Sequence, residues 1–120
     1  MGKNVLIVED DEIIQHVLEW RLSSLGYSVC GKAATADDAI TLAGEKNPDV
    51  VLMDIQLKGP VDGIEAAKVI KNRFQVPVIF LTASSENGDI ERAKEVSPDG
   101  FIVKPFTDTD IRVALKFALE

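Results

Sequence analysis

The chain has 120 residues, 46% of them hydrophobic, which fits one compact domain that buries a core without disulfides or a structural metal. Twenty acidic against 13 basic residues leave a formal net charge of -7, which argues against nucleic-acid binding, because recognition of a phosphate backbone needs a basic patch. No apolar run approaches the ~18 residues of a membrane span, and the N-terminus turns acidic too soon for a secretory signal, so we expect no membrane association and a cytoplasmic location.

Five short apolar segments alternate with segments of helical pattern. The apolar segments are residues 4–8, 27–33, 49–53, 76–81 and 100–103. Three of them are continuously apolar, as expected of parallel strands that helices cover on both faces. The second segment is the exception and is expected near an edge of the sheet. This alternation predicts an α/β fold, a doubly wound five-stranded parallel sheet with right-handed crossovers.

Helix signals fill the gaps between the strands. The expected helical segments are residues 10–26, 36–46, 62–76, 84–98 and 108–120. Acidic residues open the first segment and Gly26 closes it. Thr35 and Thr107 are each followed three residues later by an aspartate, a pattern typical of helix N-caps. The fourth segment has few large apolar residues, and we expect its helix to start between residues 86 and 90.

Polar residues follow four of the expected strands. These residues are Glu9, Asp10 and Asp11 after the first strand, Asp54 after the third, Thr82, Ala83 and Ser84 after the fourth, and Lys104 and Pro105 after the fifth. In doubly wound sheets, ligands bind beyond the carboxyl ends of the strands, where the strand order reverses. Clustered carboxylates form the hard-oxygen site that Mg²⁺ prefers, and the hydroxyl and the ammonium are then expected to bind a phosphate.

Each of these residues also has a simpler interpretation when it is taken alone. The acidic run is a favourable helix start, Lys104 a solvated surface lysine, and Thr82 a strand-end cap. Their joint placement at four strand ends favours a shared site. Outside this group, we expect His16 to be an exposed helix residue and Trp20 a partly buried one, with a partner surface as the alternative for Trp20. Cys30 is expected to be a small buried thiol on a strand.

Five motifs stand at the ends of the expected strands or just beyond them. They are VLIVEDD, VVLMDIQL, DGIEAA, VPVIFLTA and GFIVKPF. With them the chain resembles, along its whole length, the receiver domain of two-component response regulators, the CheY-like fold. The resemblance implies a single receiver domain over residues 1–120 with the strand order 2-1-3-4-5. It also implies a phosphoacceptor that catalyses only its own phosphorylation and dephosphorylation, and not an enzyme in the usual sense.

The resemblance assigns chemical roles to the residues at the strand ends. Asp54 would receive a phosphoryl group from the phosphohistidine of a sensor histidine kinase or of a histidine phosphotransfer protein. The implied Mg²⁺ ligands are Glu9, Asp10, Asp54 and the backbone carbonyl of Gln56. The implied ligands of the phosphoryl oxygens are Thr82, the amide of Ala83, and Lys104. Asp54 is then a nucleophile whose charge the metal and the lysine offset.

The resemblance also implies a switch and two contact surfaces. The Lys104–Pro105 peptide bond is expected to be cis, and Phe101 takes the aromatic switch position, responding when Thr82 moves toward the phosphoryl group. The surface that changes is the face of the fourth helix, the fifth strand and the fifth helix, where an output domain or a second copy would bind. The expected docking surface for the phosphodonor consists of Ile14, Pro105 and Phe106.

Two features depart from the usual receiver pattern. Glu9 stands where many members carry aspartate, and its longer arm is expected to reach the metal through water or with a shifted geometry. Asp62 lies eight residues after Asp54, one more than is usual, so the intervening loop is longer. The chain stops within or just after its last helix, and we expect it to be a piece of a larger protein.

Three other functions fit these residues less well. A phosphohydrolase of the haloacid dehalogenase type also becomes phosphorylated on an aspartate at a strand end. That class needs a second aspartate two residues later on the same strand, and a substrate cap. The segment VEDDEI and the absence of a cap-sized insertion from the sequence fit this class poorly. A receiver that only mediates protein contacts is a second alternative, which the intact set Asp10, Asp54, Thr82 and Lys104 disfavours. No glycine-rich turn follows the first strand, which excludes a dinucleotide-binding domain.

Overall fold

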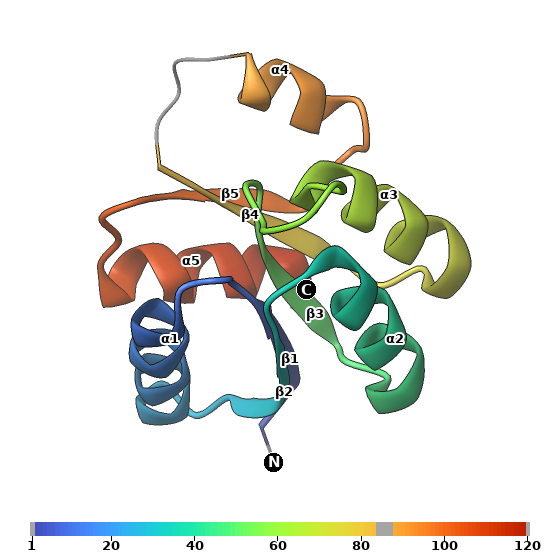
Figure 1. Cartoon of the computed structure of the whole chain (residues 1–120). Coiled ribbons are helices and arrows are strands. Elements are labelled where there is room, and N and C mark those ends of the chain that lie inside the picture. The colour runs from blue at the N-terminus through green and yellow to red at the C-terminus, as the bar shows by residue number, and fades with distance from the viewer. Residues whose placement is uncertain (1, 84–87, 120) are drawn as a thin grey trace.

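One parallel sheet forms the centre of the molecule, with its five strands in the order β2-β1-β3-β4-β5 (Figure 1). The structure, a computed structural model, describes residues 2–83 and 88–119. The elements in chain order are β1 (Asn4–Val8), α1 (Glu12–Ser24), β2 (Ser28–Ala33), α2 (Ala36–Lys46), β3 (Val50–Asp54), α3 (Gly63–Phe74), β4 (Val78–Thr82), α4 (Asp89–Lys94), β5 (Gly100–Val103) and α5 (Asp108–Leu119). The predicted fold class and strand order are confirmed.

The strand register places the ends of β3 and β4 one residue beyond their apolar runs. Asp54 is opposite Leu81, and Thr82 is opposite Val103, so both polar residues belong to the sheet itself. β2 lies at an edge, as its mixed pattern predicts. The order reverses between β1 and β3, and the polar residues that follow these strands therefore meet at one place.

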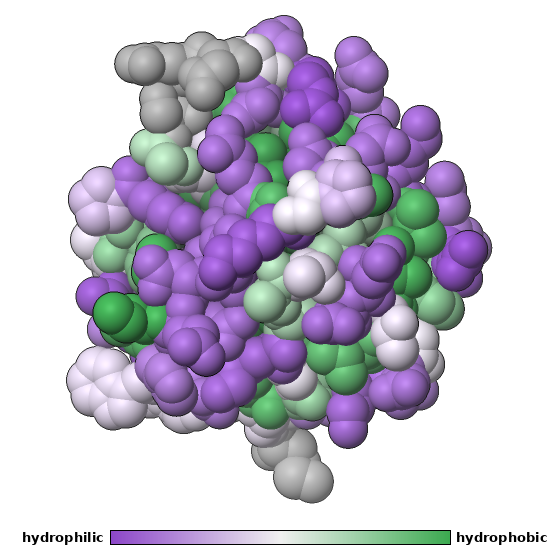
Figure 2. Space-filling view, viewed as in Figure 1, coloured by the Kyte–Doolittle hydropathy of each residue, from purple (hydrophilic) through white to green (hydrophobic). Residues whose placement is uncertain are grey.

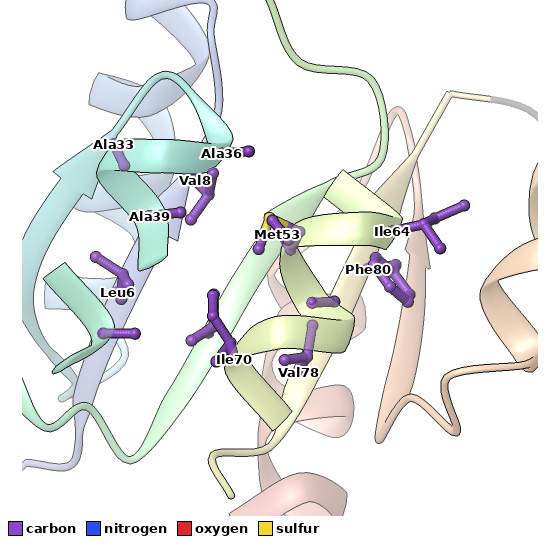
Figure 3. Close-up of a cluster of buried hydrophobic side chains, with 14 of the residues drawn as sticks. Leu6, Val8, Ala33, Ala36, Ala39, Met53, Ile64, Ile70, Val78 and Phe80 are labelled. Atoms are coloured by element: carbon purple, nitrogen blue, oxygen red, sulfur yellow. The ribbon is translucent and has the colours of Figure 1, made fainter. Parts of the chain in front are cut away.

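Helices cover both faces of the sheet. α1 and α5 lie on one face and α2 and α3 on the other (Figure 1). Successive strand residues point to opposite faces, so Leu6 packs under α2 and α3 while Ile7 packs under α1 and α5. Figure 3 shows the first of these two cores, where Met53 and Phe80 lie beneath α3. Burial on both faces explains why the central strands read as continuous apolar runs.

Local capping sets the helix starts that the sequence predicts. The Oγ1 atom of Thr35 accepts a hydrogen bond from the backbone of Asp38 at 3.2 Å. Thr107 and Asp110 bond each other reciprocally, at 2.9 and 3.1 Å, and start α5 as a capping box. The cap of α1 is Asp11, whose Oδ1 accepts from two backbone amides of the first turn.

The structure differs from the sequence-based expectations for Trp20, for Cys30 and for the end of α3. Trp20 is not partly buried but 72% exposed, because α1 turns Leu18 and Leu22 toward the sheet and Trp20 away from it. Cys30 is half-buried on the edge strand, where burial raises the pKa of its thiol. α3 ends at Phe74, two residues before the expected end.

The fourth helix is short. α4 has six residues and begins at Asp89, inside the expected interval, part of which lies outside the described residues.

His16 is exposed, as expected. None of the helices in the described part of the chain has the length and apolar content needed to cross a membrane.

The start of α3 lies directly against the backbone of the third strand. Gly63 donates a hydrogen bond to the carbonyl of Ile55 at 2.7 Å. A Cβ atom at Gly63 would lie 1.9 Å from the carbonyl oxygen of Asp54, a distance that real atoms do not reach. A side chain here would therefore push apart α3 and the strand that ends in Asp54.

We predict that Gly63→Ala lowers the free energy of unfolding by about 1–3 kcal/mol or more, the cost of overpacking a tight contact. Urea unfolding monitored by circular dichroism measures this change. Gly100→Ala is the matched control, because its new Cβ would meet only side-chain atoms at 3.6–4.0 Å. Equal stability of the two variants would contradict the prediction.

Candidate functional site

A cavity of about 470 Å³ opens at the carboxyl edge of the sheet, where the strand order reverses. Its lining residues are Glu9, Asp10, Asp11, Ile14, Asp54, Ile55, Gln56, Thr82, Ala83, Asp89 and Lys104. Every residue that the sequence predicts as a metal or phosphoryl ligand is among them. The fold thus brings the ends of β1, β3, β4 and β5 to one cavity.

Lys104 links two of the buried carboxylates. Its Nζ donates to Oε1 of Glu9 at 2.9 Å and to Oδ2 of Asp54 at 3.3 Å. Burial works against the charged ammonium, but these two carboxylates outweigh that penalty and raise the pKa of Lys104. Its backbone amide donates to the carbonyl of Thr82 at 2.8 Å, and the expected cis peptide bond to Pro105 is present.

Glu9 is 1% exposed, and both of its carboxylate oxygens have partners. Oε1 accepts from Lys104, and Oε2 accepts from the backbone amide of Asp11 at 3.1 Å. Burial raises the pKa of the Glu9 carboxyl; the Lys104 bond opposes this rise, and the nearby Asp54 carboxylate adds to it. Glu9, whose side chain is longer than the aspartate of many receiver domains, therefore serves as a buried counter-ion of Lys104.

Asp54 lies between the lysine and the loop that follows β3. Its side chain is largely covered, the residue being 7% exposed, and Oδ1 accepts from the backbone amide of Gln56 at 3.1 Å. One carboxylate oxygen from each of Glu9, Asp10 and Asp54 lies within 4.8 Å of the others. Asp10 is free for this arrangement because the neighbouring Asp11 caps α1. Three close carboxylates, one of them partly exposed, suit a hard divalent cation such as Mg²⁺.

Phe101, the expected switch residue, lies outside the cavity. Its ring packs against that of Phe80, with 6.0 Å between centroids and a tilt of 36°. Phe101 is partly buried against the core that Phe80 belongs to, and it lines a second hollow beside α5. Thr82 is buried at the cavity, one strand away from Phe101.

Ile14 and Phe106, two of the three residues of the expected docking surface, pack against the same core, and Pro105 follows the cavity residue Lys104. Ile14 lines the cavity, Pro105 is exposed and Phe106 is partly buried. Arg21 of α1, for which the sequence predicted no role at the site, links α1 to Phe106. Its guanidinium lies over the Phe106 ring at 5.4 Å and donates to the Phe106 carbonyl at 3.1 Å.

Asp89 lines the cavity and was not predicted as a site residue. Its Oδ2 accepts from the side-chain amide of Gln56 at 3.3 Å. The only signal in the sequence is an aspartate at the start of a weakly patterned helix, and that pattern is compatible with a solvated residue. Its place at the cavity depends on where α4 packs.

Comparisons with known proteins identify the family of this chain. The family model described as Response regulator receiver domain matches residues 5–116. The chain belongs to this family. The transcriptional regulatory protein PdtaR of Mycobacterium tuberculosis (strain CDC 1551 / Oshkosh) is 35% identical over 117 residues. That match covers 98% of this chain and 57% of PdtaR, so the receiver domain spans just over half of that relative.

Solved receiver domains have the same fold. The signal receiver domain of a modulated diguanylate cyclase from Desulfovibrio desulfuricans G20 is 34% identical, with a TM-score of 0.93 over 99% of this chain and 94% of that chain. The receiver domain of a sensor histidine kinase from Pseudomonas aeruginosa PAO1 is 31% identical, with a TM-score of 0.88 over 100% of both chains. That structure has a magnesium ion coordinated in its active site cleft.

The crowding of Glu9, Asp10 and Asp54 predicts opposite effects for two neighbouring aspartates. In chelator, Asp10→Asn should raise the free energy of unfolding by an amount on the order of 1 kcal/mol, because it relieves like-charge repulsion. Asp11→Ala should lower it by about 1 kcal/mol, because it removes the cap of α1. Thermal unfolding of both variants tests this, and destabilisation by Asp10→Asn would show that Asp10 has a structural role.

The raised pKa of Glu9 predicts a pH dependence. The folded chain holds this proton more tightly than the unfolded chain, so the resulting stability is complete below the ordinary pKa of 4.5 and is lost as the pH rises through the raised value. The Glu9→Gln variant has no carboxyl to deprotonate at this position, so it does not lose this stability as the pH rises. Its free energy of unfolding relative to wild type should therefore increase between about pH 4 and about pH 8, measured in urea with chelator. A difference that stays constant with pH would contradict the raised pKa.

Proposed function

We propose that this receiver domain accepts a phosphoryl group on Asp54 from a phosphohistidine, in a reaction that requires Mg²⁺. The observation that supports the proposal most directly is the position of Lys104, whose ammonium contacts Asp54 and Glu9 inside a cavity rich in carboxylates. This arrangement leaves the Asp54 carboxylate beside a cation and at the wall of the cavity. We also propose that residues 1–120 form a single receiver domain.

In the proposed step, a carboxylate oxygen of Asp54 attacks phosphorus and the bond from phosphorus to the histidine nitrogen breaks. The nitrogen keeps the electron pair and takes up a proton, while Asp54 becomes an acyl phosphate. Lys104, the Thr82 hydroxyl and the Ala83 amide would hold the phosphoryl oxygens, on which charge accumulates during transfer. Mg²⁺, when bound, neutralises part of this charge.

The proposed ligands of the metal are Glu9, Asp10, Asp54 and the backbone carbonyl of Gln56. The spacing of the three carboxylates supports this set. Because both oxygens of Glu9 already have protein partners, we propose that Glu9 contributes its charge, or a water-mediated contact, while Asp10 and Asp54 bind the ion directly.

The proposed output of this reaction is a change at the face made by α4, β5 and α5. Thr82 would move toward the phosphoryl group and Phe101 would repack by apolar contact alone, since phenylalanine carries no hydroxyl. Val103, Val113 and Phe117 are exposed apolar residues of this face. An output domain or a second copy of the chain is the partner that we propose for it.

The proposed phosphodonor is a sensor histidine kinase or a histidine phosphotransfer protein, docked over Ile14, Pro105 and Phe106. An apolar rim beside an acidic cavity suits a helical partner that presents a histidine. The net charge of -7 disfavours nucleic acid as a direct partner of this chain. We propose a cytoplasmic location and a signalling role, with catalysis limited to the domain's own phosphorylation and dephosphorylation.

We predict that acetyl phosphate adds one phosphate per chain when Mg²⁺ is present, detected by intact mass. Asp54→Asn should abolish this labelling, because the amide is a poor nucleophile. Chelation of Mg²⁺ should also abolish it. Lys104→Ala should reduce labelling strongly, since it removes the cation beside the reacting oxygens.

The same assay, extended to phosphate esters and to phosphoramidate, separates the proposal from its alternatives. Continuous turnover of phosphate esters without a stable labelled species would indicate a phosphohydrolase. A folded wild type that takes up no phosphate from acetyl phosphate or phosphoramidate would indicate a domain that only mediates contacts. Labelling of Asp54→Asn equal to that of wild type would place the phosphoryl group on another residue.

A further inference from the structure

Apolar packing attaches α4 only weakly to the rest of the domain. The helix has six residues, its N-cap Gly88 offers no side-chain bond, and Ala93 is its one buried residue. Figure 1 shows α4 apart from the other helices, at the top of the view, and Figure 2 shows mainly hydrophilic atoms over this region. Val96, just after the helix, packs against the core. Polar contacts must therefore contribute much of what fixes the start of α4.

Four side chains form a continuous polar chain from the cavity to α3 through α4. Gln56 donates to Oδ2 of Asp89 at 3.3 Å, and Oδ1 of Asp89 lies 3.5 Å from Nη1 of Arg92. Nη2 of Arg92 donates to Oδ2 of Asp62 at 2.8 Å. We call Gln56, Asp89, Arg92 and Asp62 the clasp. Its far end is fixed because the other oxygen of Asp62 caps α3.

The near end of the clasp faces the proposed metal site. Asp89 and Gln56 both line the cavity of Asp54, and the Gln56 amide donates to Asp54 itself. Asp89 lies outside the three carboxylates whose oxygens come within 4.8 Å of one another. Its charge is thus placed to act on a cation in the cavity without being one of the close ligands.

We propose that the clasp couples the docking of α4 to the binding of Mg²⁺, with Arg92 as a positioning residue that holds Asp89 and Gln56 at the cavity. This inference rests on the proposed function, from which it takes the identity of the ion. A divalent cation attracts the Asp89 carboxylate and favours the docked helix. Because such coupling is reciprocal, a docked helix in turn raises the affinity for Mg²⁺.

The sign of the effect of Arg92 distinguishes this coupling from simple electrostatics. Removing a positive charge near an acidic cavity should strengthen cation binding if only through-space attraction acts. If Arg92 works by positioning, its removal lets Asp89 and Gln56 leave the cavity and weakens cation binding. The matched control is Lys94, on the same helix, which pairs at 3.7 Å with the exposed Glu91 and takes no part in the clasp.

Mg²⁺ affinity is measured by calorimetric titration of wild type, Arg92→Ala, Arg92→Lys and Lys94→Ala, all as the full chain. We expect Arg92→Ala to weaken Mg²⁺ binding by roughly two- to fivefold, the range that a partly exposed ion pair supports. Arg92→Lys should recover part of this loss, and Lys94→Ala should bind as tightly as wild type or slightly more tightly. Thermal unfolding of each variant in chelator verifies that the fold is retained.

Hydrogen exchange supplies a second readout on the helix itself. Saturating Mg²⁺ should slow amide exchange across residues 89–96 in wild type and do so much less in Arg92→Ala. If wild type binds Mg²⁺ but Arg92→Ala binds it equally or more tightly, the coupling is wrong and the proposed metal site stands. If wild type binds no Mg²⁺, both the metal site and the coupling are wrong.

Discussion

The ion pairs of Lys104 are the interactions on which the carboxyl edge of the sheet depends. Glu9 and Asp54 are almost fully covered, and a covered carboxylate without a partner costs several kcal/mol. Lys104 reaches both of them from the end of β5, across the end of β4, while its backbone amide bonds to Thr82. The lysine can do this only if β1, β3, β4 and β5 end at the same edge in the observed order.

One ammonium does not balance the charge of the cavity. Five carboxylates line it, from Glu9, Asp10, Asp11, Asp54 and Asp89. Backbone amides in the first turn of α1 stabilise the Asp11 carboxylate, and Arg92 pairs with Asp89, so Lys104 is left to offset the other three carboxylates. Burial is the main cause of the raised pKa of Glu9, and the nearby Asp54 carboxylate adds to it. We expect this excess of negative charge to reduce the stability of the domain when no cation is bound, which is a common cost of function.

Much of the fold and most of the site could be predicted because their signals are local. Apolar runs mark the strands, Thr35 and Thr107 mark helix starts, and the polar residues of the site directly follow the strands. The features that were missed depend on tertiary placement. The exposure of Trp20 depends on which face of α1 meets the sheet, and hydrophobicity alone does not show that. Arg92 and Asp62 are 30 residues apart, and no local pattern pairs them.

Asp62 and Gly63, the pair at the start of α3, together constrain the positions of three elements. Asp62 caps the helix with one oxygen and binds Arg92 of α4 with the other. Gly63 allows the first turn of α3 to touch the backbone of Asp54, where any larger residue would collide. The positions of the strand that carries Asp54, of α3 and of the start of α4 are therefore linked at two adjacent residues. A pair that the sequence presents only as a helix start thus connects the strand that ends in Asp54 to a helix whose own packing is weak, and the coupling proposed for the clasp would use this connection.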